Sequence, residues 1–217
     1  RMIAGRFKII RKLGQGGMGA VYLAEQVGIG HRVAIKFLLA LTDRAARKRF
    51  AVEAQAVALI DHPNVLRVHR SGEIAGRPYL VVELIRGHSL AEQPLPLPWQ
   101  EVLRIGSAAA QGLAAAHRCG VLHRDVSPGN IMLTEAQDVK LVDFGLAKIV
   151  TDGKVGTLTQ GGQLFGTPPY MAPERWRDEP TTARSDVYGL GAILFELASG
   201  RRPHVAKNFA TLGTAIL

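Results

Sequence analysis

The chain has 217 residues, of which 47% are hydrophobic and 21% are charged. This balance is typical of a soluble globular protein and excludes disordered, collagen-like and disulfide-stapled chains. Lysine and arginine total 27 against 18 aspartate and glutamate residues, so the net charge of +9 predicts an anionic partner. The single cysteine, Cys119, cannot form a disulfide within the chain and fits a reducing compartment.

The sequence also bears on membrane insertion and secretion. No run of about 18 uncharged apolar residues occurs, so we expect no transmembrane helix in these residues. The N-terminal residues lack the apolar stretch and cleavage site of a signal peptide, so secretion is not indicated.

Strands dominate the first third of the chain. β-branched and aromatic residues alternate there with polar ones, as in half-buried strands. One helix interrupts them, beginning near Asp43 and ending before Pro63, and Phe50, Ala54 and Val57 predict its buried face. The predicted strands cover residues 6–13, 20–26, 31–38, 65–71 and 79–84.

Beyond Gly87 the pattern becomes helical. Apolar residues recur at intervals of three and four over residues 102–116 and again over 187–197, which predicts two amphipathic helices. Short apolar runs lie between them, and the Gly- and Thr-rich stretch 151–167 is expected to be a loop.

This change in composition predicts two lobes. Residues 1–83 would form a small strand-rich lobe, residues 84–87 a hinge, and residues 88–217 a mainly helical lobe. We expect a cleft between the two lobes, next to the hinge at residues 84–87.

A glycine-rich segment, Gly14-Gln15-Gly16-Gly17-Met18-Gly19, matches the spacing G-x-G-x-x-G. Dinucleotide-binding folds share this spacing but continue directly into a helix. Here Ala20-Val21-Tyr22-Leu23 continues as a strand, which favours a hairpin whose backbone amides approach phosphate oxygens. Taken alone, the motif also allows a glycine-rich hairpin without a ligand.

Lys36 follows in the predicted strand 31–38, on the same face as Ala34. A lysine there points beneath the glycine hairpin, although a lone strand lysine is usually only solvated. Glu53 lies on the apolar face of the predicted helix, so its carboxylate needs a partner. Lys36 is predicted to be that partner.

The segment His123-Arg124-Asp125-Val126-Ser127-Pro128-Gly129-Asn130 places an acid and an amide on one tight loop. Asp125 could orient or deprotonate a hydroxyl group, while the amide oxygen of Asn130 suits a hard cation. On its own, an aspartate before a proline turn is more often a local cap. Asp143, in Asp143-Phe144-Gly145 at a strand end, is either a turn former or a ligand of Mg²⁺.

In this order the motifs resemble those of eukaryotic-like (Hanks-type) protein kinases, in particular the bacterial serine/threonine members. The resemblance runs from Phe7 to the chain end. It implies an α+β, two-lobed protein kinase-like fold, with a strand-rich N-lobe carrying one key helix and a mainly helical C-lobe. It also implies an enzyme that transfers the γ-phosphoryl group of ATP to serine or threonine of protein substrates, itself included.

The resemblance assigns roles to individual residues. It implies that Lys36 contacts the α- and β-phosphates of ATP and pairs with Glu53, that Asp125 is the catalytic base, and that Asn130 and Asp143 hold Mg²⁺, or alternatively Mn²⁺. Val57, Val68, His123 and Phe144 would stack between the lobes. The implied nucleotide contacts are Leu13, Gly14, Gly16, Gly17, Gly19, Val21, Ala34, Lys36, Met132, the backbone of Glu83 and Ile85, and the gatekeeper Val82.

The end of the activation segment resembles the family in Gly166-Thr167-Pro168 and Ala172-Pro173-Glu174. Thr167 there argues for serine or threonine acceptors, and Asp186 matches the buried aspartate that braces the catalytic loop. Arg124 precedes the base, as in kinases switched by phosphorylation of the activation loop, so Thr157 and Thr159 are candidate phosphosites. Alternatively, these threonines only occupy a flexible loop.

Two departures bear on activity. Ser127 stands where serine/threonine kinases usually carry a lysine that neutralises the γ-phosphate, which predicts a slower but active enzyme. The chain ends at Leu217, where the family continues with further helices, so we expect a fragment with a truncated C-lobe. The alternative is a pseudokinase-like module that binds nucleotide with little turnover.

The expected partners are ATP and protein substrates, with a dimer allowed for trans-autophosphorylation. Nucleic acid is not expected, since Lys36 and Arg124 already have phosphate-directed roles by resemblance. We expect a cytoplasmic location, either for the whole protein or for this domain of a longer, membrane-anchored one.

Overall fold

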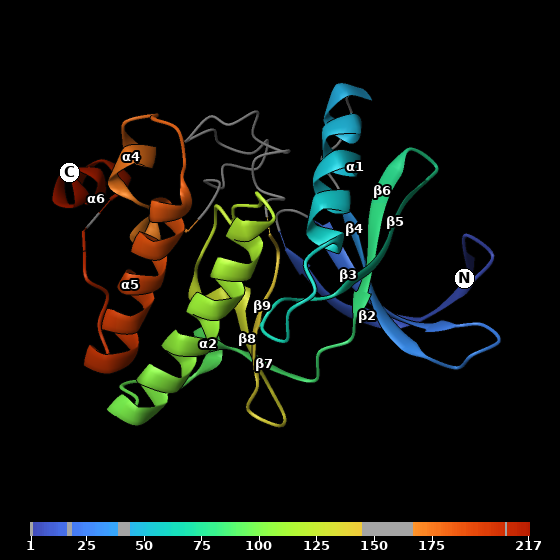
Figure 1. Cartoon of the computed structure of the whole chain (residues 1–217), viewed down its shortest axis with the longest axis horizontal. Coiled ribbons are helices and arrows are strands. Elements are labelled where there is room, and N and C mark those ends of the chain that lie inside the picture. Colours follow the sequence, from blue (N-terminus) through green and yellow to red (C-terminus); the bar gives the residue numbers. More distant parts are fainter. Residues whose placement is uncertain (1, 17–18, 39–43, 145–166, 207) are drawn as a thin grey trace.

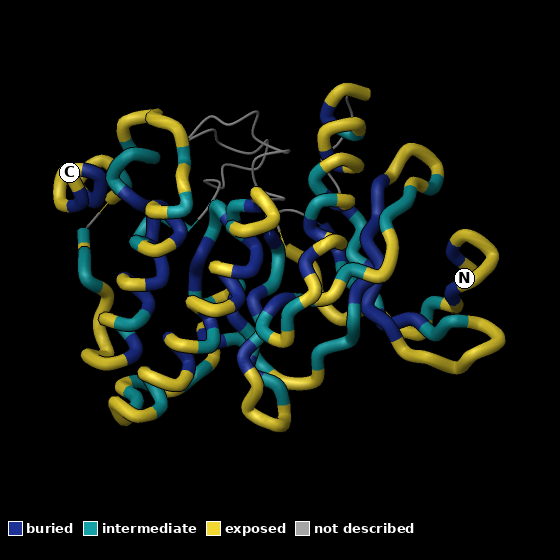
Figure 2. Tube along the Cα trace, viewed as in Figure 1, coloured by how far each residue is buried: buried dark blue, intermediate teal, exposed yellow. Residues whose placement is uncertain are grey.

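The computed structural model describes residues 2–16, 19–38, 44–144, 167–206 and 208–217. These residues form two lobes joined at residues 84–86 (Figure 1). One lobe is built on a sheet with a helix across it, and the other is mainly helical. Figure 2 shows that buried positions gather inside each lobe, whereas exposed positions follow the turns and the outer faces of the helices. The predicted α+β fold is confirmed.

The N-terminal lobe contains a six-stranded antiparallel sheet in the order β1-β2-β3-β4-β6-β5. Sequential hairpins connect its strands, except where the helix α1 enters between β4 and β5. The strands are β1 (Met2–Ile3), β2 (Phe7–Gly16), β3 (Gly19–Gln26), β4 (Arg32–Leu38), β5 (Val68–Ile74) and β6 (Arg77–Glu83).

Helix α1 (Arg44–Ala58) packs against this sheet with the predicted face, which includes Phe50, Ala54 and Val57. Phe50 is 3% exposed and joins Ala34, Leu38 and Val82 of the sheet in one apolar cluster. Burying a phenylalanine of this kind contributes about 1.5–3 kcal/mol. The predicted beginning of the helix at Asp43 lies outside the described residues.

The C-terminal lobe is organised around two helices, α2 (Trp99–Arg118) and α5 (Ala183–Ser199), which pack against each other. Both were expected from the apolar periodicity. A small sheet of β7 (Gly87–Ser89), β8 (Ile131–Thr134) and β9 (Val139–Leu141) lies beside α2. The remaining elements are the 3-10 turns η1 (Leu90–Glu92), η2 (Pro128–Asn130) and η3 (Pro168–Tyr170), and the helices α4 (Pro173–Trp176) and α6 (Phe209–Ile216).

Local signals explain the limits of α5. Thr182 precedes the helix, and its side chain accepts a hydrogen bond from the Arg184 amide, as an N-cap does. Gly200 ends the helix in a left-handed conformation with φ 72°, which a residue with a side chain adopts at a cost.

No helix among the described residues combines the length and the apolar character needed to cross a membrane.

The observed strand boundaries differ from the predicted ones by up to three residues, and one of these shifts affects the contact between the lobes. The strand expected over residues 65–71 is observed as β5 (Val68–Ile74). Val65 instead forms a bridge with Leu141 of β9, and the Leu66 amide donates to the Leu141 carbonyl at 2.9 Å. The apolar residues at 65 and 66 therefore bind the segment before β5 to the C-terminal lobe, because a short apolar run does not specify which sheet it joins.

Candidate active site

A cavity of about 430 Å³ lies between the two lobes. Residues from β2, β3, β4, β6 and the connection 84–86 form one side, and β8 with residues 142–144 forms the other. Its lining includes nine of the residues predicted to bind nucleotide or metal, namely Leu13, Val21, Ala34, Lys36, Val82, Glu83, Ile85, Met132 and Asp143. A largely apolar cavity with a few charged groups has the character of a small-molecule site.

The described glycines of the motif lie on the paired strands β2 and β3. Gly14 and Gly16 lie on β2, Gly19 begins β3, and Gly17 lies outside the described residues. Gly19 is required by packing, since a Cβ there would approach the Phe37 carbonyl oxygen to 1.9 Å. A Cβ added at Gly14 or Gly16 would have no atom within 4 Å. Neither glycine lines the cavity.

The alternation of β4 places Lys36 in the cavity as predicted. Ile35 is fully buried on the opposite face of the sheet, in a separate apolar cluster, whereas Ala34 and Lys36 face the cavity. The side chain of Lys36 is 12% exposed, and its Nζ lies 2.6 Å from Oδ1 of Asp143. Two of the predicted phosphate and metal ligands therefore meet directly.

The predicted pairing of Lys36 with Glu53 is wrong in this structure. Lys36 pairs with Asp143, while Oε1 of Glu53 lies 3.1 Å from Nη1 of Arg124. Each carboxylate thus has a cation, which meets the requirement that a partly buried charge be paired. The sequence showed that Glu53 needed a partner but could not distinguish between two cations that lie on different lobes.

The loop of residues 123–130 adjoins the cavity through Gly129, and it holds Asp125 in a small recess beside Thr167. The Nδ2 of Asn130 donates to the Asp125 backbone carbonyl at 2.8 Å and to Oδ2 of its carboxylate at 2.9 Å. The Thr167 hydroxyl donates to the other carboxylate oxygen of Asp125 at 3.4 Å. Both oxygens of Asp125 are therefore oriented by residues that the sequence had singled out.

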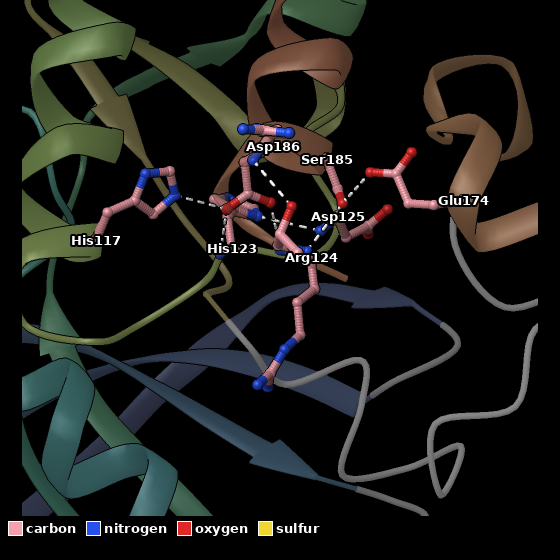
Figure 3. Close-up of polar contacts among 9 residues, drawn as sticks. His117, His123, Arg124, Asp125, Glu174, Ser185 and Asp186 are labelled. Carbon is pink, nitrogen blue, oxygen red and sulfur yellow. Dashed lines mark hydrogen bonds and ion pairs between the residues drawn. The ribbon is translucent and has the colours of Figure 1, made fainter. Parts of the chain in front are cut away.

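Asp186 anchors this loop, as predicted. It is 1% exposed, and its carboxylate accepts hydrogen bonds from the backbone amides of His123 and Arg124, each at 2.8 Å. Nε2 of His117 lies 2.8 Å from the same carboxylate. Figure 3 shows Asp186 between His117 and the 123–130 loop. These contacts hold Arg124 in a left-handed conformation with φ 66°, which is strained for a residue with a side chain.

His123 and Phe144 connect the loop to the apolar core. Their ring centroids lie 4.5 Å apart, and both residues are buried. Val57 belongs to the same cluster as Phe144, and Val68 packs against it, so the predicted stack between the lobes is confirmed. Burial lowers the pKa of His123, because the charged ring would lose its hydration, although nearby Asp186 opposes this effect.

The donor set suits a divalent cation only together with other oxygen ligands. Asn130 forms both of its hydrogen bonds through Nδ2, which leaves Oδ1 as an acceptor, and Asp143 supplies a carboxylate. Among the described residues, no group of three or more His, Cys, Asp or Glu side chains could hold a metal by itself. One amide and one carboxylate match Mg²⁺, which usually takes few protein ligands alongside water and phosphate oxygens.

The sequence missed two contacts at this site. Glu83 accepts hydrogen bonds from Nζ of Lys140 at 2.7 Å and from the Arg67 amide at 2.8 Å, which joins β6 to β9 across the lobes. Lys140 stands between two buried residues of β9, and the alternation of the strand points it to the other face, so no sequence signal indicated this contact. Arg175 is the second, with its Nη1 2.6 Å from the Arg124 carbonyl oxygen, and no motif marked it. The candidate phosphosites Thr157 and Thr159 lie outside the described residues.

Comparison with known proteins agrees with this geometry. Residues 7–215 match the family model described as "Protein kinase domain". Serine/threonine-protein kinase Pkn1 of Myxococcus xanthus is 42% identical over 213 residues, which are 95% of this chain and 30% of that protein. Serine/threonine-protein kinase PrkC of Bacillus subtilis is 36% identical over 217 residues, covering 98% of this chain and 33% of that protein.

A solved structure shows the same fold. The PknI kinase domain of Mycobacterium tuberculosis superposes with a TM-score of 0.76 at 32% identity, covering 94% of this chain and 77% of that domain. The chain thus spans about a third or less of the length of the curated relatives named above. From the family match, the identities and the arrangement of Lys36, Asp125, Asn130 and Asp143, the chain belongs to the protein kinase family.

Proposed function

We propose that this chain transfers the γ-phosphoryl group of ATP to serine or threonine hydroxyls of protein substrates, including its own. The observation that carries the proposal is the orientation of Asp125 by Asn130 and Thr167, on a loop whose Gly129 lines the interlobe cavity. A base held on both carboxylate oxygens has little freedom to lose when a hydroxyl group binds. The relatives named above are serine/threonine-protein kinases, which supports the same reaction here.

In this reaction Asp125 accepts the proton of the substrate hydroxyl. The hydroxyl oxygen forms a bond to the γ-phosphorus while the bond to the β-phosphate oxygen breaks, and ADP leaves with that electron pair. Lys36, which lines the cavity, supplies positive charge for the phosphates. Asn130 and Asp143 would hold Mg²⁺, or Mn²⁺ in its place, which neutralises phosphate charge when bound.

The arrangement of Thr167 supports serine and threonine as acceptors. Its hydroxyl bonds to Asp125, and Tyr170 three residues later is anchored by a hydrogen bond to Glu196 of α5. The segment between them is thereby fixed beside the base, where a substrate chain would lie. Binding of nucleotide without turnover is not favoured, because Lys36, Asp125, Asn130 and Asp143 are all present and lie at the cavity or on the loop that adjoins it.

The partners and location follow from this activity. We propose that the chain acts in the cytoplasm, where ATP is available, and that two copies meet when one phosphorylates Thr157 or Thr159 of the other. Arg124 would then exchange Glu53 for the new phosphate, because a phosphate offers more charge than one carboxylate. Mixing an inactive chain of different mass with the active one tests whether phosphate passes between copies.

A labelled-ATP assay tests the proposed reaction. Full-length wild type, Asp125→Asn and Lys36→Met are compared on autophosphorylation and on a generic basic protein, with Mg²⁺, Mn²⁺ or a chelator present. Asp138→Asn, an exposed carboxylate, serves as the matched control. We expect label in wild type and Asp138→Asn, at least about 100-fold less in the two site variants, and none with chelator. Equal incorporation in all four proteins would overturn the assignment.

A further inference from the structure

Arg175 is the one cation of the described residues whose side chain donates to the backbone of the 123–130 loop. Its Nη1 donates to the carbonyl oxygen of Arg124 at 2.6 Å, which is the peptide directly before Asp125. Arg175 also lines a small recess together with Asp125 and Thr167. Burial lowers the pKa of Arg175, while the negative charges of Asp125 and Asp186 favour its charged form.

The other cations of the site are already engaged. Lys36 lies 2.6 Å from Asp143, and Arg124 lies 3.1 Å from Glu53 on α1. Residue 127, within the loop itself, is a serine that is 3% exposed and carries no charge. Among the described residues, the guanidinium of Arg175 is therefore the positive charge that lies beside Asp125 without a carboxylate partner of its own in an ion pair.

The position of Arg175 is fixed from both sides. Glu174 accepts a hydrogen bond from the Ser185 hydroxyl of α5, and Trp176 stacks on Phe209 of α6 with ring centroids 4.4 Å apart. An arginine between two such anchors loses little conformational freedom when it binds the loop. Charge placed in advance, in a partly buried position, stabilises a reacting centre without further rearrangement.

We propose that Arg175 is a positioning residue of this kinase, and that it supplies beside Asp125 the fixed positive charge that Ser127 does not. Its hydrogen bond orients the Arg124–Asp125 peptide, and its charge stabilises the ionised carboxylate that accepts the proton. This inference rests on the proposed phosphoryl transfer. It predicts that the need for Arg175 depends on residue 127, because a lysine there would place a second positive charge two residues from Asp125.

The test is a double-mutant cycle in the full-length protein. Initial rates of peptide phosphorylation are measured for wild type, Arg175→Gln, Ser127→Lys and the double variant, with Arg177→Gln as an exposed control from the same segment. We expect Arg175→Gln to lower kcat at least about tenfold with the KM for ATP changed by less than about twofold. In the Ser127→Lys background the same substitution should lower kcat by less than about threefold, and Arg177→Gln should have no effect.

A purely structural role for Arg175 predicts a different result. It would lower kcat equally in both backgrounds, and this outcome, like an unchanged kcat in Arg175→Gln, overturns the proposal. Thermal unfolding checks that the variants are folded. If Arg175→Gln does not fold, Arg175→Lys is measured in the two backgrounds instead, and a loss that does not depend on residue 127 has the same meaning.

The proposal and the proposed function fail in different ways. Wild type no more active than Asp125→Asn would remove the kinase assignment and the role of Arg175 together. An active wild type with an Arg175→Gln variant of equal kcat would remove the role of Arg175 alone.

Discussion

Glu53 of α1 and Arg124 of the 123–130 loop form an ion pair of 3.1 Å that connects the two lobes. Lys36 of β4 pairs with Asp143, on the opposite side of the cavity, at 2.6 Å. The resemblance to kinases implied a pairing of Lys36 with Glu53 instead. The structure thus shows an arrangement in which Arg124 holds the carboxylate of α1, and Lys36 is neutralised by the residue expected to bind metal.

The first prediction concerns the strength of this interlobe ion pair. Both side chains are partly exposed, so a double-mutant cycle of Glu53→Gln and Arg124→Gln should give a coupling energy of about 0.2–1 kcal/mol. The coupling should become smaller as salt is added, because solvent ions screen the pair. Urea unfolding of the four proteins measures it, and a coupling within error of zero at low salt would contradict the prediction.

A second prediction compares two glycines of the β2–β3 hairpin. Gly19→Ala should lower the free energy of unfolding by about 1–3 kcal/mol, because the new Cβ would meet the Phe37 carbonyl oxygen and strain the backbone. Gly16→Ala, which meets no atom within 4 Å, should change it by less than about 0.5 kcal/mol. Urea unfolding of both variants tests the contrast, and equal effects would show that the close approach is not the cause.

The third prediction concerns Asp186, whose buried carboxylate accepts hydrogen bonds from two backbone amides of the 123–130 loop. Asp186→Asn places an amide nitrogen where one acceptor oxygen was, which should cost about 1.5–3 kcal/mol of stability. Asp178→Asn, at an exposed position, is the control. Thermal and urea unfolding measure the loss of stability in each variant. Equal losses in Asp186→Asn and Asp178→Asn would contradict the prediction.

A fourth prediction is a pH dependence of stability caused by His123. Burial lowers its pKa in the folded state below the ordinary value of about 6.5, so the unfolded state binds more protons when the pH falls below that value. Stability should therefore decrease below pH 6.5 by at most about 1.4 kcal/mol per pH unit from this residue, with no contribution above it.

Substitution of His123 by phenylalanine isolates this effect. Phenylalanine keeps a ring against Phe144 but cannot take up a proton, so His123→Phe should reduce the slope of unfolding free energy against pH between 6.5 and 5. Urea unfolding at several pH values in this range measures the slope. The same slope in both proteins would assign the acid sensitivity to other groups.

Sequence patterns predicted the elements that depend on local information. Alternation in residues 31–38 and the three-four spacing in residues 102–116 identified β4 and α2, because side-chain burial follows the periodicity of each element. Predictions were weaker where a short apolar run could join either of two sheets, as Val65 does with Leu141. The hairpin strand β1, two residues long, carried no pattern at all.

By itself, the sequence determined which chemical groups are present and which peptide motifs hold them, from the glycine hairpin to Asp125, Asn130 and Asp143. Only the tertiary structure decided how the charges pair, since ion pairing depends on distances between lobes that no sequence spacing contains. It assigned Glu53 to Arg124, Lys36 to Asp143, and Arg175 to the loop that bears Asp125. Coulombic attraction falls with distance and with exposure, so the partner of each charge follows from the packing of helices and sheets around it.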